Sequence, residues 1–508
     1  MTYQLFAAID VGSYELEMKI FELSQKKGIT LLNHVRHVIE IGKDTYVTGR
    51  VDFKHIDEVC EILYDFTKIM REYHVEKYVA YTTSSIREAG NRDIILDRIR
   101  VKTGLNINVL SNSEQRFLGY KALSVKPEFF SYIQEGTAIV DVGAGSIQIS
   151  LFDKDSLVTT QNIKLGSLRI RELLYKLSTD REHFNRLIEE LINNDIQTFM
   201  KLYLKDRSIK NIIAMGDYIG YFAKKQGEMC DYMLREQFLK RFDSLMSKGS
   251  EEISMELDIT EEQASILIPC VQVFKRLIEE TETTNVWFAG LDLCDGIAAD
   301  YSISNKIIKV NHNFNDDILH AARIISKRYK ANQNHIAILE KNVLTIFDAM
   351  KKYHGLGENE RLFLQLAAIL HDCGKYISMS QPGEASYNII MATEIIGLSH
   401  RQREIVANVV KHNTEDFFDD PESIYENEDN DSMTVIKLVA ILRVANAMDR
   451  SHKQKFKDSK AVIKGDNLII TTYQKDDITL EKGLFSKKAE FFEEVYGIKP
   501  ILKQKKDA

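Results

Sequence analysis

The sequence predicts three successive fold classes. Residues 1–308 read as an α/β region, 309–453 as an all-α domain and 454–508 as a small α+β domain. In the first region, short apolar runs typical of strands alternate with segments of helical periodicity. From about residue 315 onward almost every segment has apolar residues at helical spacing, and a hairpin and a helix follow near the end of the chain.

The α/β region contains an internal repeat. FAAIDVGSYELEMKIFELS begins at Phe6 and TAIVDVGAGSIQISLFDKD begins at Thr137, and each consists of a strand, an Asp-Val-Gly turn and a second strand. A Pro/Glu/Gly connection around 126–136 separates the two copies. We therefore predict two subdomains, 1–126 and 127–308.

The elements follow in order along the chain. Strands are expected at 4–10 and 16–23, and a helix at 55–73. Two strand–turn–helix units come next, the second of which starts its helix at Ser111 or Ser113, residues that cap helices well. Later we expect helices over 181–204 and 228–248, a strand over 211–218, an acidic connection over 415–431 and a hairpin turning at 465–467.

Composition narrows the class of protein. The 508 residues carry a net charge of −8 with 44% hydrophobic residues, which is typical of a folded globular chain and argues against DNA binding by charge. Five scattered cysteines form no Cys-X-X-Cys pair, which fits a reducing cytoplasm and no disulfide framework. The first apolar run has no basic residues before it and is interrupted by Asp10, so we expect neither a signal peptide nor a membrane association.

The two Asp-Gly turns predict phosphate binding. Small residues let backbone N–H groups approach an anion closely, and Mg²⁺ prefers a few carboxylates together with water and phosphate oxygens. We expect Asp10 and Asp141 to hold Mg²⁺. The residues expected to hold phosphate are Gly12, Ser13, Gly143, Ala144, Gly145 and Ser146.

Several stretches together resemble the exopolyphosphatase/guanosine pentaphosphate phosphatase (Ppx/GppA) family. They are AAIDVGS at 7–13, YTTSSIREAGNR at 81–92, LSNSEQR at 110–116, IVDVGAGS at 139–146 and KLGSLRIREL at 164–173. The resemblance implies an actin-like, duplicated ribonuclease-H fold and a homodimer. It also implies Mg²⁺-assisted hydrolysis of a terminal phosphoanhydride in polyphosphate or guanosine pentaphosphate, a phosphate contact by Arg87, and a glutamate that activates water.

The chain departs from the family pattern where that chemistry is expected. Tyr14 and Glu15 replace an Asn-Ser pair, and GDYIGY at 216–221 replaces small residues. The catalytic glutamate position is occupied by Gln115, and the glutamate after the second turn is replaced by Gln148. An amide has no useful basicity at neutral pH and offers no charge to Mg²⁺. Glu114 can take over only if the start of its helix is turned or shifted by one residue, since neighbouring side chains on a helix point about 100° apart.

The helical domain contains a second constellation. His335, His371-Asp372, His412 and Asp449 occur in the order of an HD phosphohydrolase site, each at the end of an expected helix. Imidazole and carboxylate ligands suit a transition metal, so His335, His371, Asp372 and Asp449 are candidate ligands.

Three functions remain open. The first is a phosphatase with weak turnover, acting on polyphosphate or guanosine pentaphosphate. The second is a sensor that binds polyphosphate or guanosine tetra- or pentaphosphate without hydrolysing it. The third is a metal-dependent phosphohydrolase in the HD-like domain.

Overall fold

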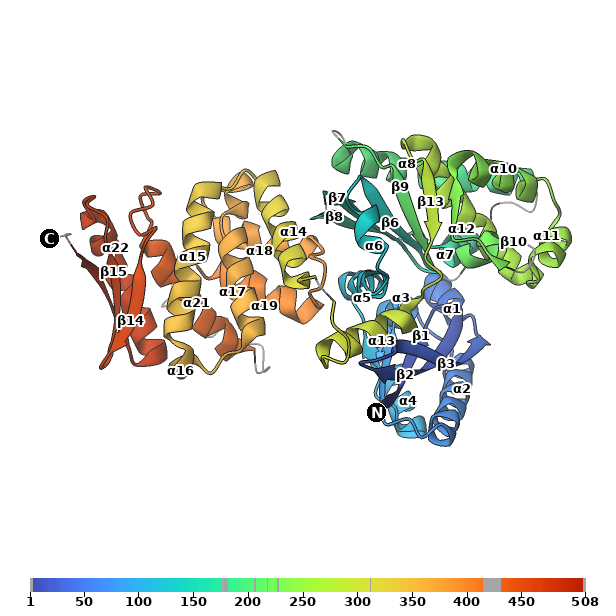
Figure 1. The fold of residues 1–508 in the computed structure, drawn as a ribbon, viewed down its shortest axis with the longest axis horizontal. Coiled ribbons are helices and arrows are strands. Elements are labelled where there is room, and N and C mark those ends of the chain that lie inside the picture. Colours follow the sequence, from blue (N-terminus) through green and yellow to red (C-terminus); the bar gives the residue numbers. More distant parts are fainter. Residues whose placement is uncertain are drawn as a thin grey trace. The chain divides into compact units, whose positions relative to one another are not determined.

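The computed structural model describes residues 3–505 apart from 155, 176, 178–180, 205–206, 217, 226–227, 311 and 414–430. The chain divides into two compact units, Met1–His312 and Asn313–Ala508 (Figure 1). Most of the predicted acidic connection at 415–431 lies outside the described residues. Within the described part, no helix is long and apolar enough to cross a membrane.

The first unit begins with a five-stranded sheet in the order β3-β2-β1-β4-β5. Its strands are β1 (Gln4–Val11), β2 (Glu15–Ser24), β3 (Gly28–Val38), β4 (Lys77–Thr82) and β5 (Asn108–Val109). Strand β1 is antiparallel to β2 and parallel to β4, so the carboxyl end of β1 meets the carboxyl end of β4 at one edge. The helices are α1 (Ile41–Thr48), α2 (Phe53–Glu72), α3 (Ser84–Glu88), α4 (Arg92–Thr103), α5 (Asn112–Ser124) and α6 (Phe129–Tyr132).

The second sheet repeats this pairing. Strand β6 (Thr137–Val142) is antiparallel to β7 (Ile147–Asp153) and parallel to β9 (Asn211–Met215), in a six-stranded order β12-β13-β9-β6-β7-β8. The remaining strands are β8 (Ser156–Ile163), β12 (Tyr232–Leu234) and β13 (Asn285–Phe288), with a separate short pair β10 (Lys224–Lys225) and β11 (Glu228–Met229). The duplicated actin-like α/β fold expected from the sequence is confirmed.

Helices cover the second sheet and return to the first. They are α7 (Ser167–Tyr175), α8 (Arg181–Tyr203), α9 (Ile219–Ala223), α10 (Arg235–Met246), α11 (Ser250–Leu257), α12 (Glu261–Glu280) and α13 (Leu293–Ser304). Helix α13 contacts α5 and β1, which closes this unit. The predicted helix 228–248 was wrong in about its first two turns, because α10 begins at Arg235 and residues 232–234 pair with β13 as an edge strand.

The second unit is helical with a small sheet at its end. Its helices are α14 (Phe314–Arg328), α15 (Gln333–Ala349), α16 (Lys351–His354), α17 (Glu358–Leu370), the 3₁₀ turn η1 (Cys373–Tyr376), α18 (Pro382–Ala392), α19 (His400–Lys411), α21 (Ser432–Ala447) and α22 (Thr479–Tyr496). The predicted hairpin is β14 (Lys460–Lys464) with β15 (Asn467–Thr472), and β16 (Lys499–Gln504) adds to β15 in parallel.

Candidate functional site

The two Asp-Gly turns have the same backbone hydrogen bond. The Gly12 N–H donates to the Glu15 carbonyl at 3.0 Å, and the Gly143 N–H donates to the Ser146 carbonyl at 3.1 Å. These two N–H groups therefore shape the turns. The N–H groups of Ser13, Ala144, Gly145 and Ser146 are the ones left as candidates to hold phosphate.

Both turns border one small chamber between the two halves of the first unit. It has a volume of about 50 Å³, which corresponds to a few water molecules. Its wall contains the predicted residues Asp10, Gly12, Ser13, Gln115, Gly143, Ala144, Gly145 and Ser146, and also Tyr14, Glu15, Glu17, Thr83 and Ser84. Eight residues predicted from the sequence therefore border one space.

Three hydroxyl groups meet beside the chamber. Ser13 Oγ lies 2.8 Å from the Tyr46 hydroxyl and 3.1 Å from Ser84 Oγ, and the last two lie 2.9 Å apart. A Cβ on Gly145 would come within 2.2 Å of both Ser84 Oγ and the Tyr46 hydroxyl, so only glycine fits there. The guanidinium of Arg169 stacks over the Tyr46 ring at 4.0 Å and donates to the Gly145 carbonyl at 3.0 Å. The second turn is thus packed tightly on hydroxyls from the first subdomain.

The start of α5 decides which of Glu114 and Gln115 reaches the chamber. Ser111 is the N-cap, and Glu114 accepts hydrogen bonds from the Ser111 N–H at 2.9 Å and the Ser111 hydroxyl at 2.7 Å. This capping box holds the Glu114 carboxylate at the helix start, whereas half-buried Gln115 lines the chamber. The side chain from this helix start that lines the chamber is therefore an amide.

Arg87 supports this helix start from outside the chamber wall. Its guanidinium donates to the Leu110 carbonyl at 2.6 Å and to Asn112 Oδ1. Arg87 thus holds the segment that carries Gln115, and its contact with phosphate stays a prediction.

Asp141 and Gln148 are neighbours and are not among the described residues that line the chamber. They are directly opposite each other on β6 and β7, as Asp10 and Glu17 are on β1 and β2. Gln148 is 2% exposed, and among the described residues its Oε1 has no hydrogen-bond partner. Gly216 packs next to this pair with φ +108°, and a Cβ there would lie 2.6 Å from the Val142 carbonyl and 3.2 Å from Asp141 Oδ1.

Two carboxylates that the sequence analysis did not assign complete the chamber. Glu15 and Glu17 are buried on β2 and line the wall with Asp10. Arg36 of β3 donates to Glu15, and His34 of β3 contacts Glu17. The signal was present in the sequence as charged residues at alternate positions of an otherwise apolar strand, which places them on one face.

These carboxylates fit a hydrated Mg²⁺. Asp10, Glu15 and Glu17 border the space, and no lysine or arginine side chain is among the described residues of its wall. A phosphate entering such an acidic chamber needs a cation to offset the repulsion, and Mg²⁺ binds through one or two carboxylates plus phosphate oxygens. Of the two predicted ligands, Asp10 lines this wall, and the role of Asp141 stays a prediction.

A buried charge cluster adjoins β2. Lys19 forms ion pairs with Asp292 and, at 2.8 Å, with Asp295. The pKa of Asp295 is raised to about 6, because burial and the neighbouring Asp292 charge outweigh the attraction of Lys19. Lys19 holds the pKa of Asp292 below its usual value although burial opposes this. The cluster therefore carries one carboxyl group that titrates near neutral pH.

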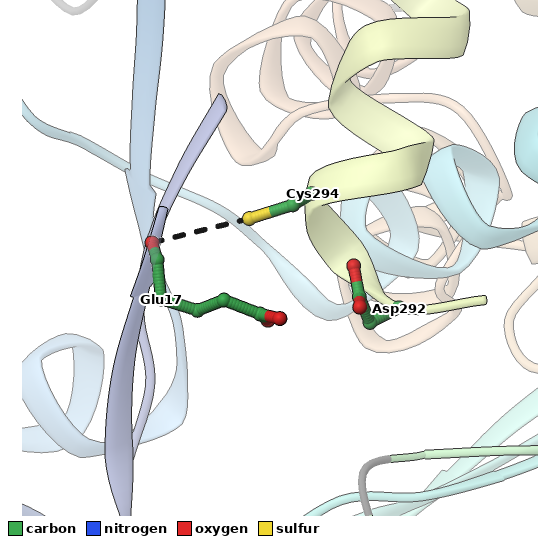
Figure 2. Close-up of side chains that lie close together, drawn as sticks. All are labelled: Glu17, Asp292 and Cys294. Atoms are coloured by element: carbon green, nitrogen blue, oxygen red, sulfur yellow. Dashed lines mark hydrogen bonds between the residues drawn. The ribbon is translucent and has the colours of Figure 1, made fainter. Parts of the chain in front are cut away.

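Glu17, Asp292 and Cys294 are the one trio, among the described residues, whose ligand atoms lie close enough for a metal. Figure 2 shows the Cys294 sulfur directed at the backbone carbonyl of Glu17, 3.9 Å away. Burial raises the pKa of the Cys294 thiol well above its usual value, and metal binding requires the thiolate. Since Lys19 already neutralises Asp292, this trio fits a structural ion pair better than a metal site.

The helical unit brings together all four predicted HD-like ligands. His335 Nδ1 lies 2.7 Å from Asp449 Oδ2, and the rings of His335 and His371 lie 5.1 Å apart. His371 Nε2 lies 3.2 Å from Asp372 Oδ1. His412 is separate, since its carbonyl accepts from Arg443.

Most of these groups have partners within the cluster, although the buried His371 Nε2 has no hydrogen-bond partner among the described residues. His335 Nε2 contacts Asn446 Oδ1 at 3.2 Å, and the His452 ring stacks on His335 at 4.0 Å. Asp372 is neutralised by Lys375 at 2.8 Å. In the described residues the four atoms do not form a set within the spacing that a metal needs. Metal binding by His335, His371, Asp372 and Asp449 therefore stays a prediction.

Comparisons with known proteins agree with this geometry. A sequence model of the Ppx/GppA phosphatase family matches residues 20–302, and a model of Ppx/GppA phosphatase domain III matches residues 319–487. The exopolyphosphatase of Cytophaga hutchinsonii, a solved structure, has a TM-score of 0.53 at 16% identity, covering 61% of this chain and 100% of that one. At that identity the likeness concerns the fold.

Three curated proteins that are similar in sequence have names that include a phosphatase or pyrophosphatase activity. The guanosine-5'-triphosphate,3'-diphosphate pyrophosphatase of Photobacterium profundum is 19% identical over 89% of this chain and 88% of its own. Exopolyphosphatase 1 of Mycobacterium leprae is 24% identical over 32% of this chain and 47% of its own. The bifunctional 3-dehydroquinate synthase/phosphatase of Fusobacterium nucleatum is 22% identical over 34% of this chain. The chain spans about half the length of the mycobacterial relative and about a quarter of the fusobacterial one.

Proposed function

The chain belongs to the Ppx/GppA phosphatase family, and we propose that its chamber binds the terminal phosphoryl group of a magnesium complex of polyphosphate or guanosine pentaphosphate. The observation that supports this most strongly is the meeting of two matched turns around a chamber whose other wall carries Asp10 and Glu17. Hydrolysis of the terminal phosphoanhydride is the reaction, and its expected rate is low.

The residues of this chain have distinct parts in that reaction. The N–H groups of Ser13, Gly145 and Ser146, with the Ser13 and Ser84 hydroxyls, orient the phosphoryl oxygens. Asp10, with Glu17 beside it, would hold Mg²⁺, which supplies charge neutralisation when bound. Gln115 can orient a water molecule by hydrogen bonding but cannot accept its proton. Catalysis then rests on positioning and charge, without a positioned base.

The amide at position 115 also favours a second function. A chamber that binds a phosphoryl group but has an amide at Gln115, where the resemblance implies the activating glutamate, suits a sensor of guanosine tetra- or pentaphosphate or of polyphosphate. The homodimer implied by the family resemblance belongs to the same proposal. A sedimentation measurement of the full chain tests it directly.

Phosphate release separates the phosphatase from the sensor. Wild type and Gln115→Glu are assayed with Mg²⁺ on long-chain polyphosphate and on guanosine pentaphosphate. Restoring a positioned base is expected to raise the rate by roughly 10²–10⁴-fold. The matched control is Glu114→Gln, which weakens the capping box without changing the charge at the chamber wall.

The outcomes are distinct. A fast wild-type rate that Gln115→Glu does not improve would exclude the sensor. A wild type without release that Gln115→Glu activates supports the sensor. If neither substrate binds or reacts in either protein, the chamber has another ligand.

A further inference from the structure

A groove lies beside the phosphate chamber, at the carboxyl ends of β9 and β13. Its volume is about 370 Å³, within the range of about 300–1,000 Å³ that small-molecule sites occupy. Strand β9 is the parallel neighbour of β6, which leads into the second turn. Gly216 lines the groove, and a Cβ on it would lie 2.6 Å from the carbonyl of Val142, the residue just before that turn. The groove and the chamber are therefore adjacent along one edge of the second sheet.

Two side-chain pairs form the boundary between the groove and the chamber. Arg36 lines the groove and donates to Glu15, which lines the chamber. His34 lines the groove and contacts Glu17, which also lines the chamber. The side chains of His34 and Arg36 are each 32% exposed. The two spaces are thus one layer of side chains apart, and a chain of phosphates that leaves the chamber would pass His34 and Arg36.

The groove wall is mainly apolar. Its apolar and aromatic side chains are Ala214, Met215, Ile219, Tyr221, Phe288 and Leu291. Of its cations, Lys19 is paired with Asp292 and Asp295, and Arg36 is paired with Glu15. A linear polyphosphate carries charge along its whole length and would lose hydration against the apolar side chains at a large cost. A planar heterocycle with its sugar suits such a wall, because most of its surface is uncharged.

Tyr221 is the aromatic side chain that is best placed to contact a heterocycle. It is half-buried, whereas Phe288 is 6% exposed and belongs to the hydrophobic core around the second sheet. The exposed Lys224 lies over the Tyr221 ring, with its ammonium 5.2 Å from the ring centroid. Stacking on an aromatic ring is available to every nucleic-acid base, since each has a π-face. The groove therefore offers a stacking surface without selecting one base.

We propose that this groove binds the nucleoside of a nucleotide whose terminal phosphoryl group occupies the phosphate chamber. The ligand class is then a nucleoside polyphosphate, and the phosphates between the two ends pass His34 and Arg36 at the boundary. Linear polyphosphate has no heterocycle to place in the groove, so it binds through the chamber alone. This inference rests on the proposed phosphate-binding function and selects between the two substrate classes named there.

The test compares two ligands that have the same number of phosphates. Guanosine triphosphate and tripolyphosphate are titrated with Mg²⁺ in a calorimeter into full-length wild type, Tyr221→Ala and Tyr221→Phe, each also in an Asp10→Asn background. Only binding that Asp10→Asn removes is assigned to the chamber, because polyanions also bind basic surfaces elsewhere. The ratio of the two affinities then reports the contribution of the nucleoside. Tyr73→Ala, on an exposed tyrosine of the first unit, is the surface control.

The nucleoside is expected to strengthen binding through Tyr221. Wild type should bind guanosine triphosphate about tenfold or more tightly than tripolyphosphate. Tyr221→Ala should lower this ratio by roughly tenfold, because the base loses its stacking surface, and should leave the affinity for tripolyphosphate unchanged. Tyr221→Phe and Tyr73→Ala should keep the wild-type ratio. The wild-type ratio needs no substitution in the groove, so it provides the test if Tyr221→Ala does not fold.

Three results overturn the proposal and differ in what else they affect. Equal affinities in wild type, with Asp10-dependent binding of tripolyphosphate intact, would refute the nucleoside site alone. A ratio that folded Tyr221→Ala leaves unchanged would refute it in the same way. Absence of Asp10-dependent binding of either ligand to wild type would refute the proposed function as well.

Discussion

The two Asp-Gly turns of the first unit have the same backbone and opposite chemistry. Each turn is closed by a hydrogen bond from its glycine N–H, and each aspartate faces a residue seven positions later on the next strand. In the first turn that residue is Glu17, which lines the chamber, and in the second it is Gln148, which is buried with an unpartnered oxygen. The two turns thus share their backbone geometry, but the residue opposite the aspartate is a carboxylate in the first turn and an amide in the second.

The difference indicates a division of roles. The second turn contributes glycines and serines that can approach a phosphate without charge, and the first contributes the carboxylates that can hold a cation. The pairing of Arg36 and His34 with Glu15 and Glu17 keeps that acidic side stable when no ligand offsets its charge. We therefore expect substitutions in the two turns to have unequal effects.

The largest expected effect comes from the two aspartates. Asp10→Asn should weaken Mg²⁺-dependent binding of tripolyphosphate by about 100-fold, because it removes a charge from the chamber wall. Asp141→Asn, the matched change in the second turn, should cost about tenfold or less, since Asp141 lies outside that wall. Calorimetry of both variants measures the contrast, and equal losses would show that both turns share the cation.

Gln148→Glu should reduce stability more than it changes binding. A carboxylate at this buried position would face Asp141 without a counter-ion, so the free energy of unfolding should fall by about 2–3 kcal/mol without metal. Gln115→Glu, at a half-buried position on the chamber wall, serves as the control with a smaller loss. Urea unfolding with and without Mg²⁺ measures both, and an unchanged midpoint for Gln148→Glu would contradict the burial argument.

The titration of Asp295 should make the free energy of unfolding of the first unit depend on pH. Its pKa is raised to about 6 by burial and by Asp292, so the folded state binds the proton more tightly than the unfolded state. The stabilisation is present below the unfolded pKa near 4 and is lost as pH rises through about 6, by roughly 1–2 kcal/mol.

The measurement is the difference in unfolding free energy between wild type and Asp295→Asn from pH 4 to pH 7. The comparison with Asp295→Asn is required because His412, in the other unit, changes stability with pH in the opposite direction. Burial lowers the pKa of His412 to about 4. Its contribution is present above pH 6.5 and is lost as pH falls toward 4. A flat difference across this range would contradict the raised pKa of Asp295.

The smallest effect is expected from metal removal in the helical unit. His335 and Asp449 satisfy each other there, and Lys375 neutralises Asp372. Chelation should therefore leave the melting temperature of this unit unchanged while it abolishes phosphate binding in the chamber. Elemental analysis of wild type and His371→Ala should show the same transition-metal content in both proteins. A stoichiometric metal that is present in wild type and lost in the variant would instead support the predicted HD-like metal site.

Most of the fold could be predicted from the sequence because the signals that specify strands, turns and helix starts lie in short segments. Strand–turn–helix order, the capping residue Ser111 and the two glycine turns are each encoded within a few residues. The predicted helix over 228–248 was wrong at its start because residues 232–234 pair with β13, more than 50 positions away. Glu15 and Glu17 were not assigned because their place in the chamber wall depends on the pairing of β1 and β2, which sets Glu17 opposite Asp10.

The sequence by itself determined that two matched turns exist and that amides stand at positions 115 and 148. Only the tertiary structure decided which side chains meet. The capping box holds Glu114 at the helix end. Asp10 is among the residues that line the chamber and Asp141 is not, and Tyr14 packs in the core of the opposite half. The physical reason is that periodicity and turn propensity act over a few residues, whereas a chamber is formed by packing between segments more than a hundred residues apart.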